Sequence, residues 1–134
     1  ASCGGGIVML YVYSISDQTV AAAGPIEFTT LGLVKNKNII QKTDTTLQFN
    51  CPGIYLVSFD ATASAAGEVQ LYLNGEEVPG ALAEGTSLAF TALIRINPNC
   101  CAITDNLPAT LQVLNEGAAA LTLTNAALTI VKVG

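Results

Sequence analysis

Apolar and polar residues alternate with a period of two along most of this chain, which is the period of a β-strand with one buried face. Residues 86–96 show this throughout: Leu88, Phe90, Ala92, Ile94 and Ile96 alternate with Ser87, Ala89, Thr91, Leu93 and Arg95. Residues 68–74 and 121–124 follow the same pattern. No segment of helical length carries an apolar stripe with a period of 3.6 residues. The pattern therefore predicts an all-β protein.

Turn-forming residues divide these runs into short strands. Asn74-Gly75 is the strongest hairpin signal, because both residues tolerate the positive φ of a type I′ turn. Further breaks fall at Cys51-Pro52-Gly53, Pro79-Gly80, Glu84-Gly85, Asn97-Pro98-Asn99 and Glu116-Gly117. The predicted strands are residues 7–15, 26–34, 39–49, 53–63, 68–74, 86–96, 109–115, 119–125 and 127–133. Many short strands at this spacing predict a sandwich or a barrel.

The length of 134 residues suits one domain. We interpret residues 1–6 as a flexible N-terminal connection and residues 7–134 as the folded head domain. Gly4-Gly5-Gly6 lacks the Lys-Ser/Thr pair and the following helix of a phosphate-binding loop. No apolar run approaches the ~18 residues of a membrane-spanning helix, so we expect no membrane insertion. The start at Ala1 suggests a mature product or an excised domain.

The composition is apolar and poor in charge. Hydrophobic residues make up 51% of the chain and charged residues 11%, against roughly 25% charged in an average soluble domain. Either uncharged polar and small residues cover the surface, or part of it is buried against other copies of the chain. The net charge is −5 and the five cations form no basic stripe, so nucleic acid is a poor partner.

Residues that carry catalysis are scarce. The chain contains no His, which removes the commonest general base near neutral pH and the commonest transition-metal ligand. The ten carboxylates are scattered and include no Asp-x-Asp-x-Asp-Gly calcium loop, although a calcium site of another design stays open. We therefore predict no enzyme activity, no catalytic residues, no cofactor and no metal. A hydrolase with two opposed carboxylates is the alternative.

The four cysteines lack the paired Cys-x-x-Cys spacing of a zinc site and allow three intrachain connectivities. We interpret Cys51 as a buried free thiol on the apolar face of its strand. Cys3 lies in the N-terminal connection, where it could link chains. Cys100 and Cys101 are adjacent, so in a strand they would point to opposite faces.

One run resembles a known family. Phe49-Asn50-Cys51-Pro52-Gly53-Ile54-Tyr55-Leu56-Val57-Ser58-Phe59 is similar to the central strand of the globular heads of the complement first component and of tumour necrosis factor. The hairpin at Asn74-Gly75 and the terminal run at residues 128–133 also fit, and the likeness extends from about Gly24 to Val133. The Ala- and Thr-rich character and residues 111–117 look closest to bacterial members, which cap collagen-like glycoproteins on spore surfaces.

This resemblance implies a ten-stranded jelly-roll sandwich that assembles as a trimer. Phe49, Tyr55, Val57 and Phe59 would then lie in the protomer core. Leu56, Ser58 and Asp60 would face the neighbouring protomers at the trimer interface.

The implied function is that of a structural protein. The chain would be the C-terminal head of a collagen-like spore-surface glycoprotein, located outside the cell in the exosporium. It would drive trimerisation of an upstream collagen-like stalk and display an outer surface, with cell adhesion to a host surface or matrix ligand as a candidate activity. The alternative is a secreted complement- or cytokine-like ligand-recognition module.

Overall fold

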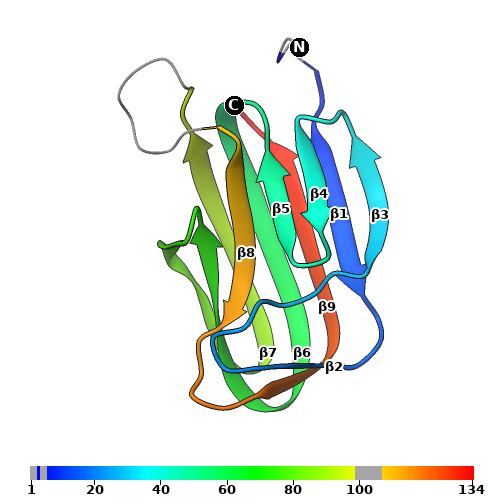
Figure 1. The fold of residues 1–134 in the computed structure, drawn as a ribbon, viewed down its shortest axis with the longest axis vertical. Helices are drawn as coiled ribbons and strands as arrows, with labels where there is room; N and C mark the ends of the chain where they lie inside the picture. Colours follow the sequence, from blue (N-terminus) through cyan, green and yellow to red (C-terminus); the bar gives the residue numbers. More distant parts are fainter. Residues whose placement is uncertain (1–2, 4–5, 99–106) are drawn as a thin grey trace.

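The structure, a computed structural model, describes residues 3, 6–98 and 107–134 and contains nine strands within them (Figure 1). In chain order they are β1 (Met9–Ser14), β2 (Gln18–Val20), β3 (Thr30–Lys35), β4 (Ile39–Thr43), β5 (Thr46–Phe49), β6 (Gly53–Leu73), β7 (Glu76–Ile96), β8 (Ala109–Asn115) and β9 (Leu121–Lys132). No helix occurs among these residues. The prediction of an all-β protein is confirmed.

The strands form two layers, and each of the long strands β6 and β7 contributes one segment to each layer. Residues 53–62 of β6 pair with residues 87–96 of β7, and residues 67–73 pair with residues 76–85. The first layer has the order β3-β1-β9-β6-β7 and the second has the order β4-β5-β8-β6-β7. Each layer thus holds five strand segments, and β2 adds to the far end of β9. This arrangement confirms the jelly-roll sandwich, with β6 and β7 each counted twice.

The hairpin at Asn74-Gly75 joins β6 to β7 as predicted. Asn74 has φ 51° and Gly75 has φ 80°, which is the pair of positive values that a type I′ turn requires. The tip also docks against β8: the Asn74 N–H donates to the Thr110 carbonyl at 2.8 Å, and the Thr110 N–H donates to the Asn74 Oδ1 at 2.9 Å. The turn is therefore fixed both by its own backbone and by a neighbouring strand.

The core lies between the two layers and is filled by the inward half of each alternating strand. Its largest fully buried side chains are Tyr55, Phe28, Phe49, Phe59, Leu10, Ile26, Ile39, Leu47, Leu71, Leu88, Ile96 and Leu111. The ring centroids of Phe49 and Tyr55, from opposite layers, lie 4.6 Å apart. The Tyr55 hydroxyl donates to the Cys51 carbonyl at 2.8 Å, and burial raises the pKa of this phenol. The buried polar end of Tyr55 is thus satisfied.

Several predicted strands have different bounds in the structure. Residues 39–49 form two strands, β4 and β5, because the chain reverses at Asp44-Thr45. Residues 119–133 contain one strand, β9, rather than two. In residues 26–34 only the part from Thr30 is a strand. Ile26 and Phe28 are buried there, and Ile26 donates its N–H to the Val113 carbonyl at 2.8 Å.

The interpretation of two cysteines was wrong. Cys3 and Cys51 form a disulfide with their Cα atoms 5.6 Å apart, so Cys51 is buried but is not a free thiol and Cys3 is not available to link chains. The partners are 48 positions apart, and no local pattern encodes a contact over that separation. The predictions for Cys100 and Cys101, and for most of the connection at residues 1–6, lie outside the described residues.

Candidate interaction surface

The outward side of the first layer carries an apolar row that crosses four strands. Tyr55 and Val57 of β6 point into the core, so Leu56 between them points outward. Leu56 pairs with Leu93 of β7 on one side and with Val131 of β9 on the other. Val131 in turn pairs with Met9 of β1. Residues paired directly across a ladder share a face, so the four apolar side chains form one row.

Two further rows run parallel to it. The first contains Tyr11, Thr129, Ser58 and Thr91, and the second contains Tyr13, Ala127, Asp60 and Ala89. Asp60 is the one carboxylate in these three rows, and its two ladder partners are both alanines. A single charge is therefore set among small and apolar neighbours.

Tyr11 and Tyr13 form an aromatic pair on β1. Their ring centroids lie 5.3 Å apart, at an interplanar angle of 34°. Both rings lie over Gly32 of β3, where an added Cβ would come within 2.7 Å of the Tyr11 ring and 2.9 Å of the Tyr13 ring. Because Gly32 has no side chain, the two rings can pack directly against the sheet at this position.

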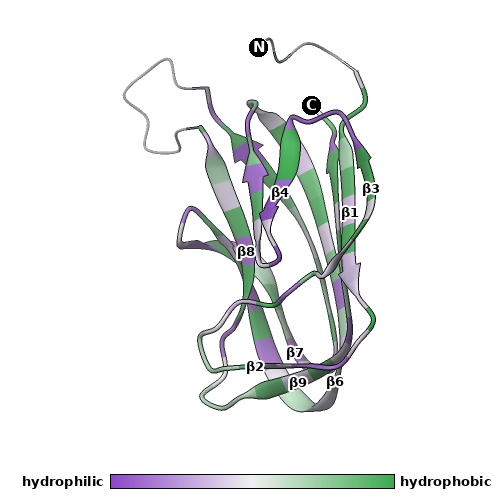
Figure 2. Cartoon of the chain, turned by 45° about the vertical axis from the view of Figure 1, so that its right-hand side comes forward, coloured by the Kyte–Doolittle hydropathy of each residue, from purple (hydrophilic) through white to green (hydrophobic). Residues whose placement is uncertain are grey.

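No residue of strand β3 is fully buried in the protomer. Its last five residues are all exposed, and three of them are large and apolar: Leu31 at 49%, Leu33 at 51% and Val34 at 40%. Figure 2 shows β3 at the margin of the layer, with hydrophobic (green) stretches along the strand. Large apolar side chains gathered on an exposed edge strand are typical of a surface that another molecule covers.

We call this surface the outer face. It consists of Met9, Tyr11 and Tyr13 of β1, Leu33 of β3, Leu56, Ser58 and Asp60 of β6, Leu93 of β7 and Val131 of β9. The predicted interface residues Leu56, Ser58 and Asp60 therefore share one outward surface. The predicted core residues Phe49, Tyr55, Val57 and Phe59 are all buried.

Several members of the outer face were not predicted from the sequence. Leu93 stands in the polar phase of its alternating strand, and 65% of its side chain is exposed. Tyr11 and Tyr13 likewise flank the buried Val12. The signal that could have found all three is a large apolar or aromatic residue in the phase that faces away from the core.

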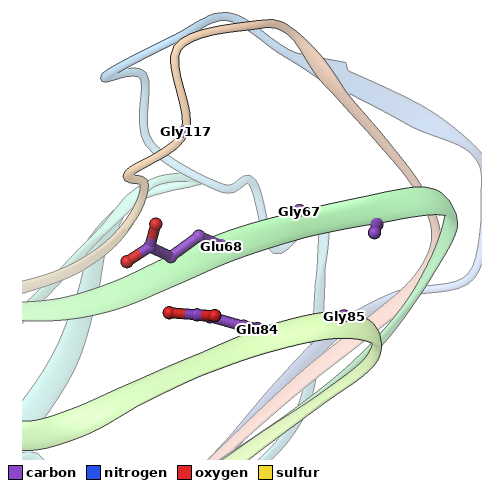
Figure 3. Close-up of a pocket in the computed structure, with 6 residues that line it drawn as sticks. Gly67, Glu68, Glu84, Gly85 and Gly117 are labelled. Carbon is purple, nitrogen blue, oxygen red and sulfur yellow. The ribbon is translucent and has the colours of Figure 1, made fainter.

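An acidic hollow lies elsewhere, in the middle of β6 and β7, where the two strands pass from one layer to the other (Figure 3). It measures about 590 Å³ and is lined by Gly67, Gly85 and Gly117 together with two glutamates. Glu68 and Glu84 are ladder partners, and their side chains extend side by side from adjacent strands. Glycoside hydrolysis needs two carboxyl groups on opposite sides of a sugar, and this pair does not have that arrangement.

Near this hollow, Tyr72 of β6 donates its hydroxyl proton to the Glu116 carboxylate. This hydrogen bond is the main reason that the pKa of Tyr72 rises to about 12, and the charge of Glu77 adds to it. At physiological pH the raised pKa changes nothing, because an ordinary phenol is also neutral there, and the hydrogen bond itself is what matters. Its role is to hold the segment after β8 against β6.

Neither a metal site nor a membrane-spanning helix is found among the residues that the structure describes. No three His, Cys, Asp or Glu side chains gather into a group that could hold a metal ion. In the same part of the chain, no helix is long and apolar enough to cross a membrane.

Solved structures share this fold at low sequence identity. The globular domain of zebrafish complement 1qA protein matches with a TM-score of 0.66 and 11% identity, over 92% of this chain and 94% of its own. Eiger TNF from S. frugiperda matches with a TM-score of 0.68 and 11% identity, over 96% and 92% of the two chains. Murine APRIL matches with a TM-score of 0.65 and 12% identity, over 96% and 100%.

The sequence itself matches no family model and no curated protein. The structural neighbours are globular heads of the complement and tumour necrosis factor type. At these identities the likeness establishes the fold, which is the jelly roll of those heads.

Proposed function

We propose that this chain is a non-catalytic head domain that assembles as a homotrimer through its outer face and presents its remaining surface to a ligand. The observation that carries this proposal is the outer face itself. Three ladder rows and the exposed strand β3 leave a continuous, mostly apolar surface with a single carboxylate, Asp60. A monomer would leave that surface in water.

The energetics favour a large contact. The mean hydropathy is +0.51, and a monomer of this size buries only roughly two-thirds of the surface of its unfolded chain. An obligate interface of roughly 2,000 Å² or more would remove apolar area from water at about 25 cal/mol per Å², before association costs are subtracted. Cyclic closure with three copies, as the family resemblance implies, gives a discrete particle.

We propose an extracytoplasmic location. The Cys3–Cys51 disulfide supports it, because such bonds persist in oxidising compartments. The more specific proposal is the head of a collagen-like glycoprotein of the bacterial exosporium, and it rests on the sequence resemblance in residues 111–117. Gly-X-Y repeats encoded directly upstream of Ala1 would support it. A signal peptide there would instead favour a secreted ligand-recognition module.

Light scattering on a size-exclusion column tests the core of the proposal. The unmodified domain should elute with three times its chain mass of 13.8 kDa at micromolar concentration. A monomeric mass there would overturn trimerisation and the function built on it.

A further inference from the structure

Strand β7 leaves a free edge on both layers. Among the described residues it pairs only with β6, so its other side offers unpaired backbone in the first layer and in the second. A groove of about 270 Å³ lies where these two edges come together. Its lining includes the apolar side chains of Leu73, Val78, Pro79 and Leu93 and the carboxylates of Glu76 and Glu77. We call it the edge groove.

The opposite margin of the first layer has the complementary character. There β3 exposes Leu33 and Val34, and it ends at Lys35, with Lys37 in the turn that follows. Both lysines are exposed. The margin at the edge groove therefore combines apolar side chains with carboxylates, and the margin at β3 combines apolar side chains with ammonium groups.

The charge in the groove is partly offset by Arg95, which also lines it. Glu76 and Glu77 contribute −2 and Arg95 contributes +1, so these three groups carry a net charge of −1. The groove as a whole still favours a basic partner.

The two margins lie at the same level along the strands. The ladder runs from Lys35 through Met9, Val131 and Leu56 to Leu93, so Lys35 and the groove residue Leu93 are the two ends of one row. Figure 1 shows β3 and β7 on opposite sides of the sandwich. In a ring of three, a rotation about an axis parallel to the strands relates each protomer to the next. Such a rotation does not shift a residue along the axis, so Lys35 of one protomer and Leu93 of the next lie at the same height and can meet.

We propose that the edge groove of each protomer receives β3 of the next, with Lys35 and Lys37 facing Glu76 and Glu77. The occupant is thus a second copy of this chain. The inference rests on the proposed trimer and deepens it, because it names the two surfaces that meet in each head-to-tail contact and the charge pairs between them.

Charge reversal tests the pairing. Glu76→Lys/Glu77→Lys and Lys35→Glu/Lys37→Glu each place like charges in every contact, so each should raise the concentration of half-dissociation by at least about tenfold. The chain that carries all four changes restores opposite charges, so it should assemble within about threefold of the unmodified domain. Lys42→Glu, an exposed lysine of β4, is the matched control and should leave assembly unchanged. Circular dichroism confirms that each variant is folded.

Mixing the two double variants gives a second readout. Contacts between unlike variants are attractive, but a ring of three always keeps one contact between like variants. An equimolar mixture should therefore form no trimer as stable as that of the four-change chain. If instead the double variants assemble normally, or the four-change chain assembles no better than they do, the pairing is overturned while the trimer stands.

Carbodiimide cross-linking of the unmodified trimer gives a readout that needs no variant. Peptide mapping should find Lys35 or Lys37 joined to Glu76 or Glu77 of another chain. Links from these lysines only to other carboxylates would reject the pairing. A monomeric unmodified domain would reject the proposed function itself.

Discussion

Leu56 of β6 and Leu93 of β7 lie directly opposite each other in the antiparallel ladder, on the outward side of the first layer. In a protomer alone, 65% of the Leu93 side chain is exposed to water. The pair adds nothing to the core, which Tyr55 and Ile94 fill from the other side of the same strands. Two leucines in this position are residues that the proposed trimer contact would cover.

Leu56→Asp should dissociate the trimer. The change would bury one unpaired carboxylate in each contact, and an uncompensated buried charge costs several kcal/mol. Light scattering should show a monomeric mass that is still folded by circular dichroism. Leu82→Asp is the matched control, because Leu82 is exposed on the second-layer half of β7, outside the three rows. If the Leu56→Asp variant still formed a trimer, the contact between protomers would have to lie elsewhere on the surface.

Gly32→Ala should weaken assembly and leave the fold of the protomer intact. The new Cβ would displace the Tyr11 and Tyr13 rings from their position over Gly32. A ring forced away from its preferred rotamer costs about 1 kcal/mol. Sedimentation of a dilution series measures the shift. In a Tyr11→Ala background the nearest clash is gone, so the same change should cost less. Equal effects in both backgrounds would exclude the aromatic pair as the cause.

Asn74→Val/Gly75→Val should destabilise the hairpin between β6 and β7. Both residues have positive φ, and a β-branched side chain there costs roughly 1–2 kcal/mol per residue. The melting temperature should fall at matched concentration. Asp44→Val is the control, because Asp44 lies in a hairpin turn without positive φ. A melting curve unchanged by the double substitution would mean that the strain at this turn is absent in solution.

Removing the disulfide should reduce the free energy of unfolding. Cys3 and Cys51 are 48 positions apart, for which the loop-entropy estimate is about 4 kcal/mol as an upper figure. Urea unfolding of Cys3→Ser/Cys51→Ala, beside the unmodified domain with and without reductant, measures the loss. Peptide mapping of the unreduced protein should recover the linked pair. Rapid alkylation of Cys51 without reductant would contradict the bond.

Alkaline titration should detect two late-ionising phenols, Tyr72 and the buried Tyr55. The pKa of Tyr72 is raised from 10.0 to about 12, first through the hydrogen bond to Glu116. A raised folded pKa means that this stabilisation is complete below pH 10 and is lost as the pH rises through about 12. Glu116→Gln removes the carboxylate and should lower the pKa, measured by phenolate absorbance. Tyr72→Phe identifies the signal, and an unchanged titration in Glu116→Gln would disprove the coupling.

Local patterns predicted most of the strands. Asn74-Gly75 and the alternation in residues 86–96 encode their structure within a few neighbouring positions, so both were recognised. The turn at Asp44-Thr45 was missed because it contains neither Gly nor Pro and needs no positive φ. The continuity of β6 through residues 64–66 was also missed, since small residues there permit either a bend or a break.

The candidate site was only partly predictable for a different reason. The outward position of Leu56, Ser58 and Asp60 follows from period two within one strand. Their alignment with Met9 and Val131 depends on the register between strands far apart in sequence, which no local pattern specifies. Contacts of this kind, like the bond between Cys3 and Cys51, come only from the assembled fold.

That disulfide also sets a path for mechanical force. Cys51 stands just before β6, and β6 pairs with β7, β8 and β9. Tension that arrives through the chain before Cys3 therefore passes by a covalent bond into the most extensively paired strand. It bypasses β1, whose ladder hydrogen bonds could otherwise be pulled apart one at a time. A head tethered at this point would resist peeling from its N-terminal side for as long as the bond stays oxidised.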